Sequence, residues 1–366
     1  MSGLKLTRPE QMLFALLRAA LYGSEANSPH FASATPEEWK SCFRMAARQG
    51  VIALAWDGVI SLPREKQPPK EVKIAWGTGV SVYEDRYKYY CQAIDELSRF
   101  YAKYGIATMQ LKGVGFSSLY PVPAHREGGD IDIYTYSADT SLMSHREATE
   151  LADRLMREQG IIVITDYDMH SQFRYKGITI ENHKTFLNVQ KSAHIAAANR
   201  ILQHYMSPQL TPLAVGRVLT PSLVFNALFI PFHAAQHYGN GLSLRHLCDW
   251  AVLIGQDGFQ MPAEMTDKYF LRFIDALSML CHEFLGSPLQ TKGDTRFAYK
   301  VLEEMLHPKY VDDISGKGKI AVFCYKVGRM FYRYRLSHSV FHTSIFREVW
   351  TSIVYHVRKP EAIFKL

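Results

Sequence analysis

Two aspartates one residue apart are the part of this sequence whose types and spacing point most directly to chemistry. They lie in the segment GGDIDIY, residues 128–134. Because successive side chains of a strand point to opposite faces, Asp130 and Asp132 would share one face, roughly 7 Å apart at their backbones, while Ile131 and Ile133 enter the core. A divalent cation is the natural counter-ion for such a pair. The alternative is a pair that only caps or solvates the end of a loop.

Polar residues before the aspartates are candidates to bind an anion. Lys112 and Gly113 close a short apolar run that is predicted to be a strand, and a glycine lets a backbone approach a phosphate closely. Arg126 precedes Asp130 by four residues and could pair with a phosphate or with Asp130 itself. A surface arginine is the alternative for Arg126.

A second group of polar side chains is spaced for one face of a helix. His233 and His237 are four residues apart, which allows zinc, but the metalloprotease motif has glutamate directly after the first histidine and this chain has Ala234. Buried core histidines, or histidines lining a cleft, are favoured over a zinc site completed by Asp249. Arg245 and Asp249, also four apart, are predicted to form a helix ion pair or a contact between regions rather than a catalytic dyad.

Length and composition indicate an ordinary globular protein of two or three domains. The chain has 366 residues, of which 47% are hydrophobic and 21% charged. Its net charge of +7 and pI near 9.0 suggest affinity for polyanions, although a solvated basic face explains the same excess. The five cysteines form no CxxC pair, so neither a disulfide framework nor a thiolate zinc site is predicted.

The same composition predicts a cytoplasmic protein without membrane insertion. The N-terminus has no apolar run after its basic residues, unlike an ordinary secretory signal. The longest apolar stretch, around 223–235, is interrupted by polar residues and a proline and is too short to span a bilayer. A reducing compartment also fits the scattered cysteines.

The elements that must position these residues form three regions. Residues 1–105 are predicted to be helical, with a helix start at Thr35-Pro36, a connector at 62–71 and a long helix over 72–104. Residues 106–188 alternate between strands, at 106–111, around the aspartates, and at 161–165, 172–175 and 178–181, and helical segments at 113–120 and 142–159. Residues 189–366 are predicted to be helical, with breaks at 207–208, 239–241, 286–288 and 316–318. The predicted fold class is therefore α+β, a small mixed-sheet core between two helical regions.

The order of these motifs resembles the nucleotidyltransferase fold shared by polymerase beta and the kanamycin nucleotidyltransferases. More closely, LKGVGFSSLYPVPAHREGGDIDIYT at 111–135 resembles an uncharacterised bacterial nucleotidyltransferase family that carries LKG, then LY, then R-x-x-x-DID. The resemblance extends to GITIEN-H at 177–183 and to PFHAAQHYGNGLSLRHLCDWAVLI at 231–254. It covers about 150 residues in the middle of the chain, and implies a nucleotidyltransferase core at 106–188.

The resemblance implies metal-dependent transfer of a nucleoside monophosphate from a nucleoside triphosphate to a hydroxyl acceptor on a small molecule, a protein or an RNA. Mg²⁺ or Mn²⁺ would be held by Asp130, Asp132 and a third carboxylate on a later strand, for which Glu181 is the candidate. The alternative for Glu181 is a strand-edge residue that faces solvent. His183 would orient the substrate or fill the next inward position of the strand.

The nucleotide-binding residues are likewise implied by the resemblance. Lys112 and Gly113 would lie beneath the triphosphate, although many members of the wider fold have Gly-Ser where this chain has Lys-Gly. Arg126 and His183 would lie nearby, and the helical region would close over the nucleotide with His233, His237, Arg245 and Asp249. A catalytically silent nucleotide-binding or interaction module with the same fold is the alternative function.

The C-terminal fifty residues carry about ten basic and two acidic side chains, with aromatic residues interleaved at 330–341. Such a segment could bind RNA through phosphates and stacking. A helix with an aromatic core face and a basic solvent face gives the same pattern and is favoured. RNA therefore stays open as an acceptor but is not the preferred one.

Overall fold

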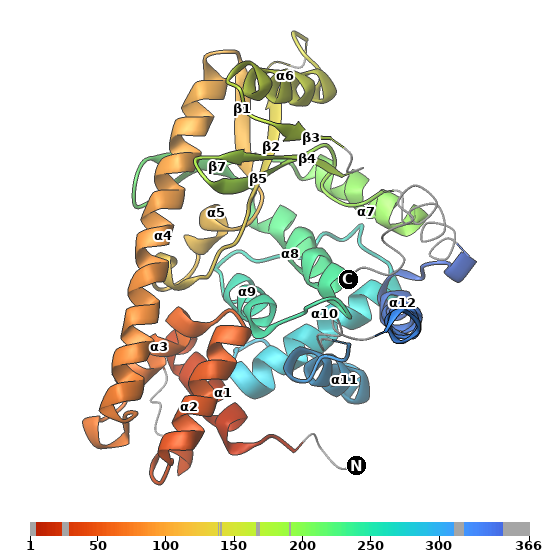
Figure 1. Ribbon diagram of the computed structural model, residues 1–366. Coiled ribbons are helices and arrows are strands. Elements are labelled where there is room, and N and C mark those ends of the chain that lie inside the picture. The colour runs from red at the N-terminus through yellow and green to blue at the C-terminus, as the bar shows by residue number, and fades with distance from the viewer. Residues whose placement is uncertain are drawn as a thin grey trace.

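A long helix connects a helical body at one end of the molecule with a β-sheet at the other (Figure 1). The computed structural model describes residues 5–23, 29–137, 139, 141–165, 169–189, 192–310 and 318–346. Helix α4 (Lys70–Ala102) runs past α1 (Arg8–Tyr22), α2 (Pro36–Arg48) and α3 (Ile52–Ser61) up to the sheet. The predicted α+β class, with helical regions before and after the core in the sequence, is confirmed.

The start of α2 shows how local sequence fixes these helices. The Thr35 hydroxyl accepts a hydrogen bond from the backbone N–H of Glu38 (3.3 Å), and the Glu38 carboxylate accepts one from the N–H of Thr35 (2.7 Å). This capping box satisfies two N–H groups that have no partner within the helix, and Pro36 is preorganised for the first helical position. The predicted helix start is confirmed.

The described strands form one seven-stranded mixed sheet in the order β3-β4-β5-β2-β1-β7-β6. The bounds are β1 Ile106–Gln110, β2 Ile131–Ser137, β3 Val163–Ile164, β4 His170–Tyr175, β5 Ile178–His183, β6 Gln209–Pro212 and β7 Arg217–Thr220. Strand β2 pairs antiparallel with β1 and parallel with β5, and Asp132 lies opposite Glu181 in the β2–β5 register. Two acidic positions far apart in the chain are therefore neighbours in the sheet.

The prediction that residues 189–366 are helical apart from four short breaks was wrong at 209–220. There β6 and β7 form a hairpin, and β7 adds to the sheet by pairing parallel with β1. Helix α7 (Ala193–His204) precedes the hairpin, and α8 (Leu223–His237), α9 (Leu244–Ile254), α10 (Lys268–Leu280), α11 (Thr295–Leu306) and α12 (Lys319–Phe341) follow it. The hairpin brings the chain back to the sheet between α7 and α8.

Two hydrophobic cores hold these layers. One lies against the sheet, where the fully buried Ile131 and Ile133 of β2 pack with α4 and with α6 (His145–Glu158). The other is shared by the N-terminal helices α1–α3 and the later helices α8–α11. The two helical regions, which lie at opposite ends of the sequence, therefore form one helical body beneath the sheet.

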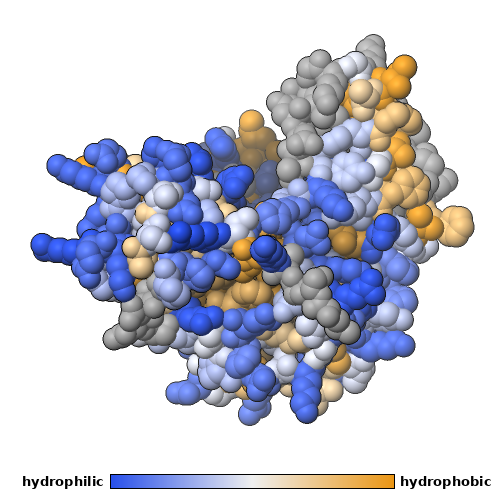
Figure 2. All heavy atoms as spheres, turned by 90° about the horizontal axis from the view of Figure 1, so that it is seen from below, coloured by the Kyte–Doolittle hydropathy of each residue, from blue (hydrophilic) through white to orange (hydrophobic). Residues whose placement is uncertain are grey.

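Helix α12 carries the exposed hydrophobic side chains Ile320, Phe323 and Phe331. Figure 2 shows hydrophobic side chains on the side of the molecule where α12 lies, whereas the side that carries α4 is mostly hydrophilic. The predicted helix at 330–341 is confirmed, but its aromatic face is not wholly buried, because Phe331 is 46% exposed. Residues 347–366 of the basic segment lie outside the described residues.

All five cysteines are unpaired, and four of them are buried. Within the described ranges, none of the helices combines the length and the hydropathy needed to cross a membrane.

Candidate functional site

Three carboxylates converge at the end of the parallel strand pair β2–β5. Asp130 directly precedes β2, Asp132 is the second residue of β2, and Glu181 lies opposite Asp132 on β5. One carboxylate oxygen from each residue lies within 4.8 Å of the others. Glu181 therefore faces the aspartates rather than open solvent, and the sheet register creates the cluster.

Asp132 is buried at the centre of this cluster, with 1% of its surface exposed. Its Oδ1 accepts hydrogen bonds from Lys112 Nζ (3.2 Å) and His183 Nε2 (3.0 Å). Burial alone would raise the pKa of Asp132, but the Lys112 ammonium and the His183 hydrogen bond outweigh it and hold that pKa far below its usual range. Asp132 is therefore an anion, and among the described residues its Oδ2 has no hydrogen-bond partner.

Glu181 lies on the side of the cluster formed by β4. Its Oε1 accepts a hydrogen bond from Gln172 Nε2 (3.3 Å) and lies 3.5 Å from His170 Nε2. Burial, followed by the negative charges of Asp132 and Asp130, raises the pKa of Glu181. A nearby cation would reverse this penalty by favouring the ionised form.

The donor set fits a divalent cation such as Mg²⁺ or Mn²⁺. Three carboxylates supply hard oxygen ligands, and the buried Oδ2 of Asp132 is an anionic oxygen without a partner among the described residues. An unsatisfied buried charged group costs more than the roughly 1 to 3 kcal/mol of a neutral one. Because Lys112 and His183 both bind Oδ1, they orient Asp132 and leave Oδ2 available to a cation.

Lys112 and Gly113 follow β1 directly and lie beside the carboxylates. Besides its contact with Asp132, Lys112 Nζ donates to Nε2 of His233 (2.8 Å). Gly113 has φ 72° and ψ −130°, a conformation that only glycine adopts readily, and an added Cβ would lie 3.3 Å from the Gln110 side-chain nitrogen. This glycine turn is what directs Lys112 toward the aspartates.

Three histidines line the opposite wall, where helices α8 and α9 meet. The rings of His233 and His237 lie 4.7 Å apart, and that of His246 lies 5.4 Å from the first and 4.8 Å from the second. Sequence spacing found the first two. His246 was missed because it lies on another helix, and its only local signal is its position three residues after the helix-capping Ser243.

Arg126 and Asp249 pair with each other rather than with the carboxylates or the histidines, although the charge of Arg126 acts on both Asp132 and His246. Arg126 donates to Asp249 through Nε and Nη2, both at 2.8 Å, and Tyr120 donates to the same carboxylate at 2.6 Å. The pair is buried and connects the segment before β2 with α9. Of the alternatives predicted for Asp249, the contact between regions is the one found, since its partner is Arg126 and not Arg245.

Arg245 contacts the same segment, because its Nη1 donates to the backbone carbonyl of Glu127 (3.4 Å). His183 contacts Asp132, as described above. The predicted site residues other than Arg126 and Asp249 therefore lie at the carboxylate cluster or at the histidine cluster. His170, Gln172 and Tyr120 are further residues that sequence reasoning did not identify. They come into place only through strand pairing and packing between regions.

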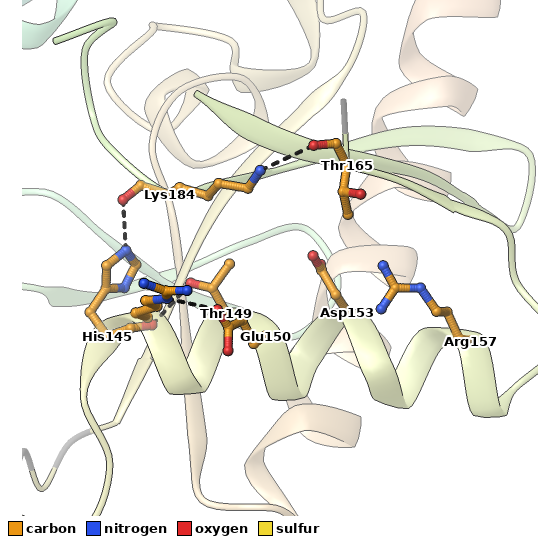
Figure 3. Close-up of a pocket in the computed structure, with 8 residues that line it drawn as sticks. His145, Thr149, Glu150, Asp153, Arg157, Thr165 and Lys184 are labelled. Carbon is orange, nitrogen blue, oxygen red and sulfur yellow. Dashed lines mark hydrogen bonds and ion pairs between the residues drawn. The ribbon is translucent and has the colours of Figure 1, made fainter. Parts of the chain in front are cut away.

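A separate hollow of about 470 Å³ lies between α6 and the strands (Figure 3). Figure 3 shows His145 and Asp153 on one face of α6, with Lys184 across from them. Asp153 accepts hydrogen bonds from Ser171 (2.7 Å) and from Asn182 (3.2 Å). Since Asn182 alternates with Glu181 and His183 along β5, this hollow is on the other face of the sheet from the carboxylates.

A cluster of carboxylates that can hold divalent cations is a feature of many enzymes that transfer phosphate-bearing groups. The model of a family described as uncharacterised nucleotidyltransferase matches residues 35–286, and the chain belongs to this family. No curated protein and no solved structure matches the chain. Membership supports transferase activity with a nucleoside triphosphate, while the wider kinship with polymerase beta stays a prediction.

Proposed function

We propose that this protein is a metal-dependent nucleotidyltransferase that moves a nucleoside monophosphate from a nucleoside triphosphate to a hydroxyl acceptor. The observation that carries the proposal is the environment of Asp132. Its Oδ1 is held by Lys112 and His183, while its Oδ2 has no partner among the described residues and lies in a cluster with Asp130 and Glu181. Such a carboxylate is built to hold a cation and not merely to cap a loop.

In the reaction, the acceptor oxygen forms a bond to the α-phosphorus, and the bond from that phosphorus to the bridging oxygen of the β-phosphate breaks, so that pyrophosphate leaves. Mg²⁺ or Mn²⁺, when bound by Asp130, Asp132 and Glu181, would neutralise charge on the phosphate oxygens. The protein's own part is positioning: Lys112 and the Gly113 turn hold the phosphates, and His183 holds Asp132.

The two sides of the cluster suggest where each substrate enters. Lys112, the histidines and Arg245 lie on one side, which suits the phosphates. Glu181 lies on the other, next to His170 and Gln172. We assign the acceptor hydroxyl to the Glu181 side, where this carboxylate would orient the hydroxyl and take up its proton as the new bond forms.

The test is release of pyrophosphate by the purified full-length protein. Each of the four nucleoside triphosphates is supplied with Mg²⁺ or Mn²⁺ and a cell extract that provides acceptors. Release that depends on the metal and is lost in Asp130→Asn supports the proposal. A folded protein that releases no pyrophosphate with any of the four nucleotides contradicts it.

Calorimetry under the same conditions separates the enzyme from the silent module of the same fold. Nucleotide binding without pyrophosphate release would show that the site has kept its ligand and lost turnover. If neither Asp130→Ala nor Asp132→Ala changes binding of nucleotide or metal, both functions are excluded for this site.

A further inference from the structure

The three histidines opposite the carboxylates are arranged for an anion rather than a metal ion. Although one ring nitrogen of each lies within 4.8 Å of the others, two of the lone pairs that a metal would need are already used. An ammonium can only donate, so Nε2 of His233 accepts from Lys112 Nζ at 2.8 Å. Zinc would have to displace this contact.

The protonated nitrogen of His246 is fixed by its place at the start of α9. Its Nδ1 accepts a hydrogen bond from the backbone N–H of Ser243 (3.1 Å), so the neutral ring carries its hydrogen on Nε2. His246 is 3% exposed, and its Nε2 is shielded from solvent without a partner among the described residues. Burial holds the pKa of His246 well below its ordinary value, which keeps the ring neutral. The result is a buried N–H donor in contact with the rings of His233 and His237.

The positive charges of Lys112 and Arg245 act on all three rings, and the negative charge of Asp130 opposes them at His237. Burial is the largest cause of the lowered pKa of His233 and His237, and the charges of Lys112 and Arg245 add to it in both cases. Neighbouring cations oppose the binding of a divalent metal ion and favour an anion. A second, independent feature is the N–H of His246, which has no partner among the described residues and could donate to a hydrogen-bond acceptor bound beside the rings.

We propose that Lys112 and His246 bind the terminal phosphates of the nucleoside triphosphate, the part that leaves as pyrophosphate. The proposal rests on the proposed function and adds the location of the leaving group. Lys112 lies between the carboxylates and the histidines, since its Nζ contacts both Asp132 and His233. An ammonium has three N–H groups, so one is left for a phosphate oxygen beyond these two contacts. A chain of phosphates that starts at the carboxylates then passes Lys112 and reaches His246 Nε2.

The test uses two substitutions that separate the roles of the two His246 nitrogens. In His246→Asn, the short amide keeps an acceptor near the position of Nδ1 and removes the donor at Nε2. In His246→Gln, the longer amide restores an N–H near the position of Nε2. Binding of inorganic tripolyphosphate to the full chain is measured by calorimetry in the presence of EDTA, so that no metal contributes.

We expect His246→Asn to weaken tripolyphosphate binding by about 10- to 100-fold, the effect of one hydrogen bond to a charged group, and His246→Gln to stay within about threefold of the wild type. Thermal unfolding of both variants shows whether α9 is intact. If His246 only caps α9, the order is reversed, with the Gln variant weaker than the Asn variant. The proposal is overturned if the Gln variant binds more weakly than the Asn variant, or if binding is unchanged in both. It is also overturned if the wild type contains stoichiometric zinc that His246→Asn removes.

Pyrophosphate release, measured in parallel, keeps this proposal separate from the proposed function. Release by the wild type together with tripolyphosphate binding that is indifferent to His246 would overturn the phosphate site and leave the transferase intact. No release, together with binding that His246→Asn weakens and His246→Gln preserves, would overturn the transferase and support the phosphate site.

Discussion

The carboxylate wall and the histidine wall of the site are built by different kinds of secondary structure and suit ligands of opposite charge. On the sheet side, the parallel register of β2 and β5 sets Asp132 beside Glu181. On the helical side, a spacing of four residues within α8 brings together His233 and His237, and α9 adds His246. Lys112 contacts both walls. One side is therefore suited to a cation and the other to an anion, and a single lysine connects them.

The two walls also differ in the charge state that their buried side chains adopt. Asp132 stays ionised because a cation and a hydrogen-bond donor are in contact with it. The histidines stay neutral because they are buried next to cations. The charge state of each wall thus depends on its neighbours more than on its residue types.

The largest effect is expected from Asp132→Asn, which removes the charge of the carboxylate wall without changing its shape. Pyrophosphate release should fall by about 10³-fold, the equivalent of roughly 4 kcal/mol of lost electrostatic stabilisation. Asp139→Asn is the matched control, because Asp139 lies just beyond β2 and is exposed. An equal loss in both variants, or nearly full activity in Asp132→Asn, would contradict a special role for the carboxylate wall.

The buried ion pair between the segment before β2 and α9 should contribute to stability. Arg126→Met leaves Asp249 buried without its cation, and breaking such a pair costs about 3 to 5 kcal/mol of the free energy of unfolding. Urea denaturation measures the loss. The control is Arg146→Met, whose ion pair with Glu150 is exposed, so that it should change stability by less than about 1 kcal/mol. Equal effects of the two substitutions would show that the buried pair adds no more stability than an exposed one.

Gly113→Ala tests whether the turn that directs Lys112 depends on glycine. The positive φ of Gly113 and the close Gln110 side chain should make this substitution cost about 1 to 3 kcal/mol of stability and reduce pyrophosphate release as Lys112 is displaced. Gly128→Ala is the control, since an added Cβ at Gly128 meets no atom within 4 Å. If denaturation and activity are the same for both variants, Lys112 is not held by the Gly113 turn.

The smallest effect concerns His125, which holds the segment that carries Arg126. His125 contacts Asp57 (2.8 Å) and Glu84 (3.1 Å); burial opposes its charged form, but these carboxylates prevail and raise its pKa. The stability it contributes is therefore fully present below the unfolded pKa of about 6.5 and is lost as the pH rises through the higher folded pKa.

The stability difference between the wild type and His125→Gln should accordingly be about 1 kcal/mol at pH 5.5 and shrink toward alkaline pH. Denaturation series at several pH values measure it. A difference that grows as the pH rises would mean that the folded protein does not favour the protonated ring.

Features with a local sequence signal could be predicted. Alternation around the aspartates gave the correct burial of Ile131 and Ile133, and the Thr35 cap marked the start of α2. The Lys-Gly turn and the strand before it were predicted for the same reason, since short apolar runs and glycines act on their immediate neighbours.

Features that depend on distant pairing could not be predicted. The β6–β7 hairpin has strands of only four residues, and it is stabilised by β1, which lies about a hundred residues earlier in the chain. Arg126 pairs with Asp249, which lies 123 residues later in the sequence. His246 contacts His233 only because α8 and α9 pack together. The predicted region boundaries at 105/106 and 188/189 stay predictions.

The most direct test of the central claim is a titration with Mn²⁺ followed by electron paramagnetic resonance. It compares the wild type with the carboxylate variant Asp132→Asn/Glu181→Gln and the histidine variant His233→Gln/His237→Gln. If the carboxylate wall holds the cation, the first double variant loses Mn²⁺ binding and the second keeps it. Loss of Mn²⁺ in the histidine variant, with binding retained in the carboxylate variant, would contradict the assignment of cation and anion to the two walls.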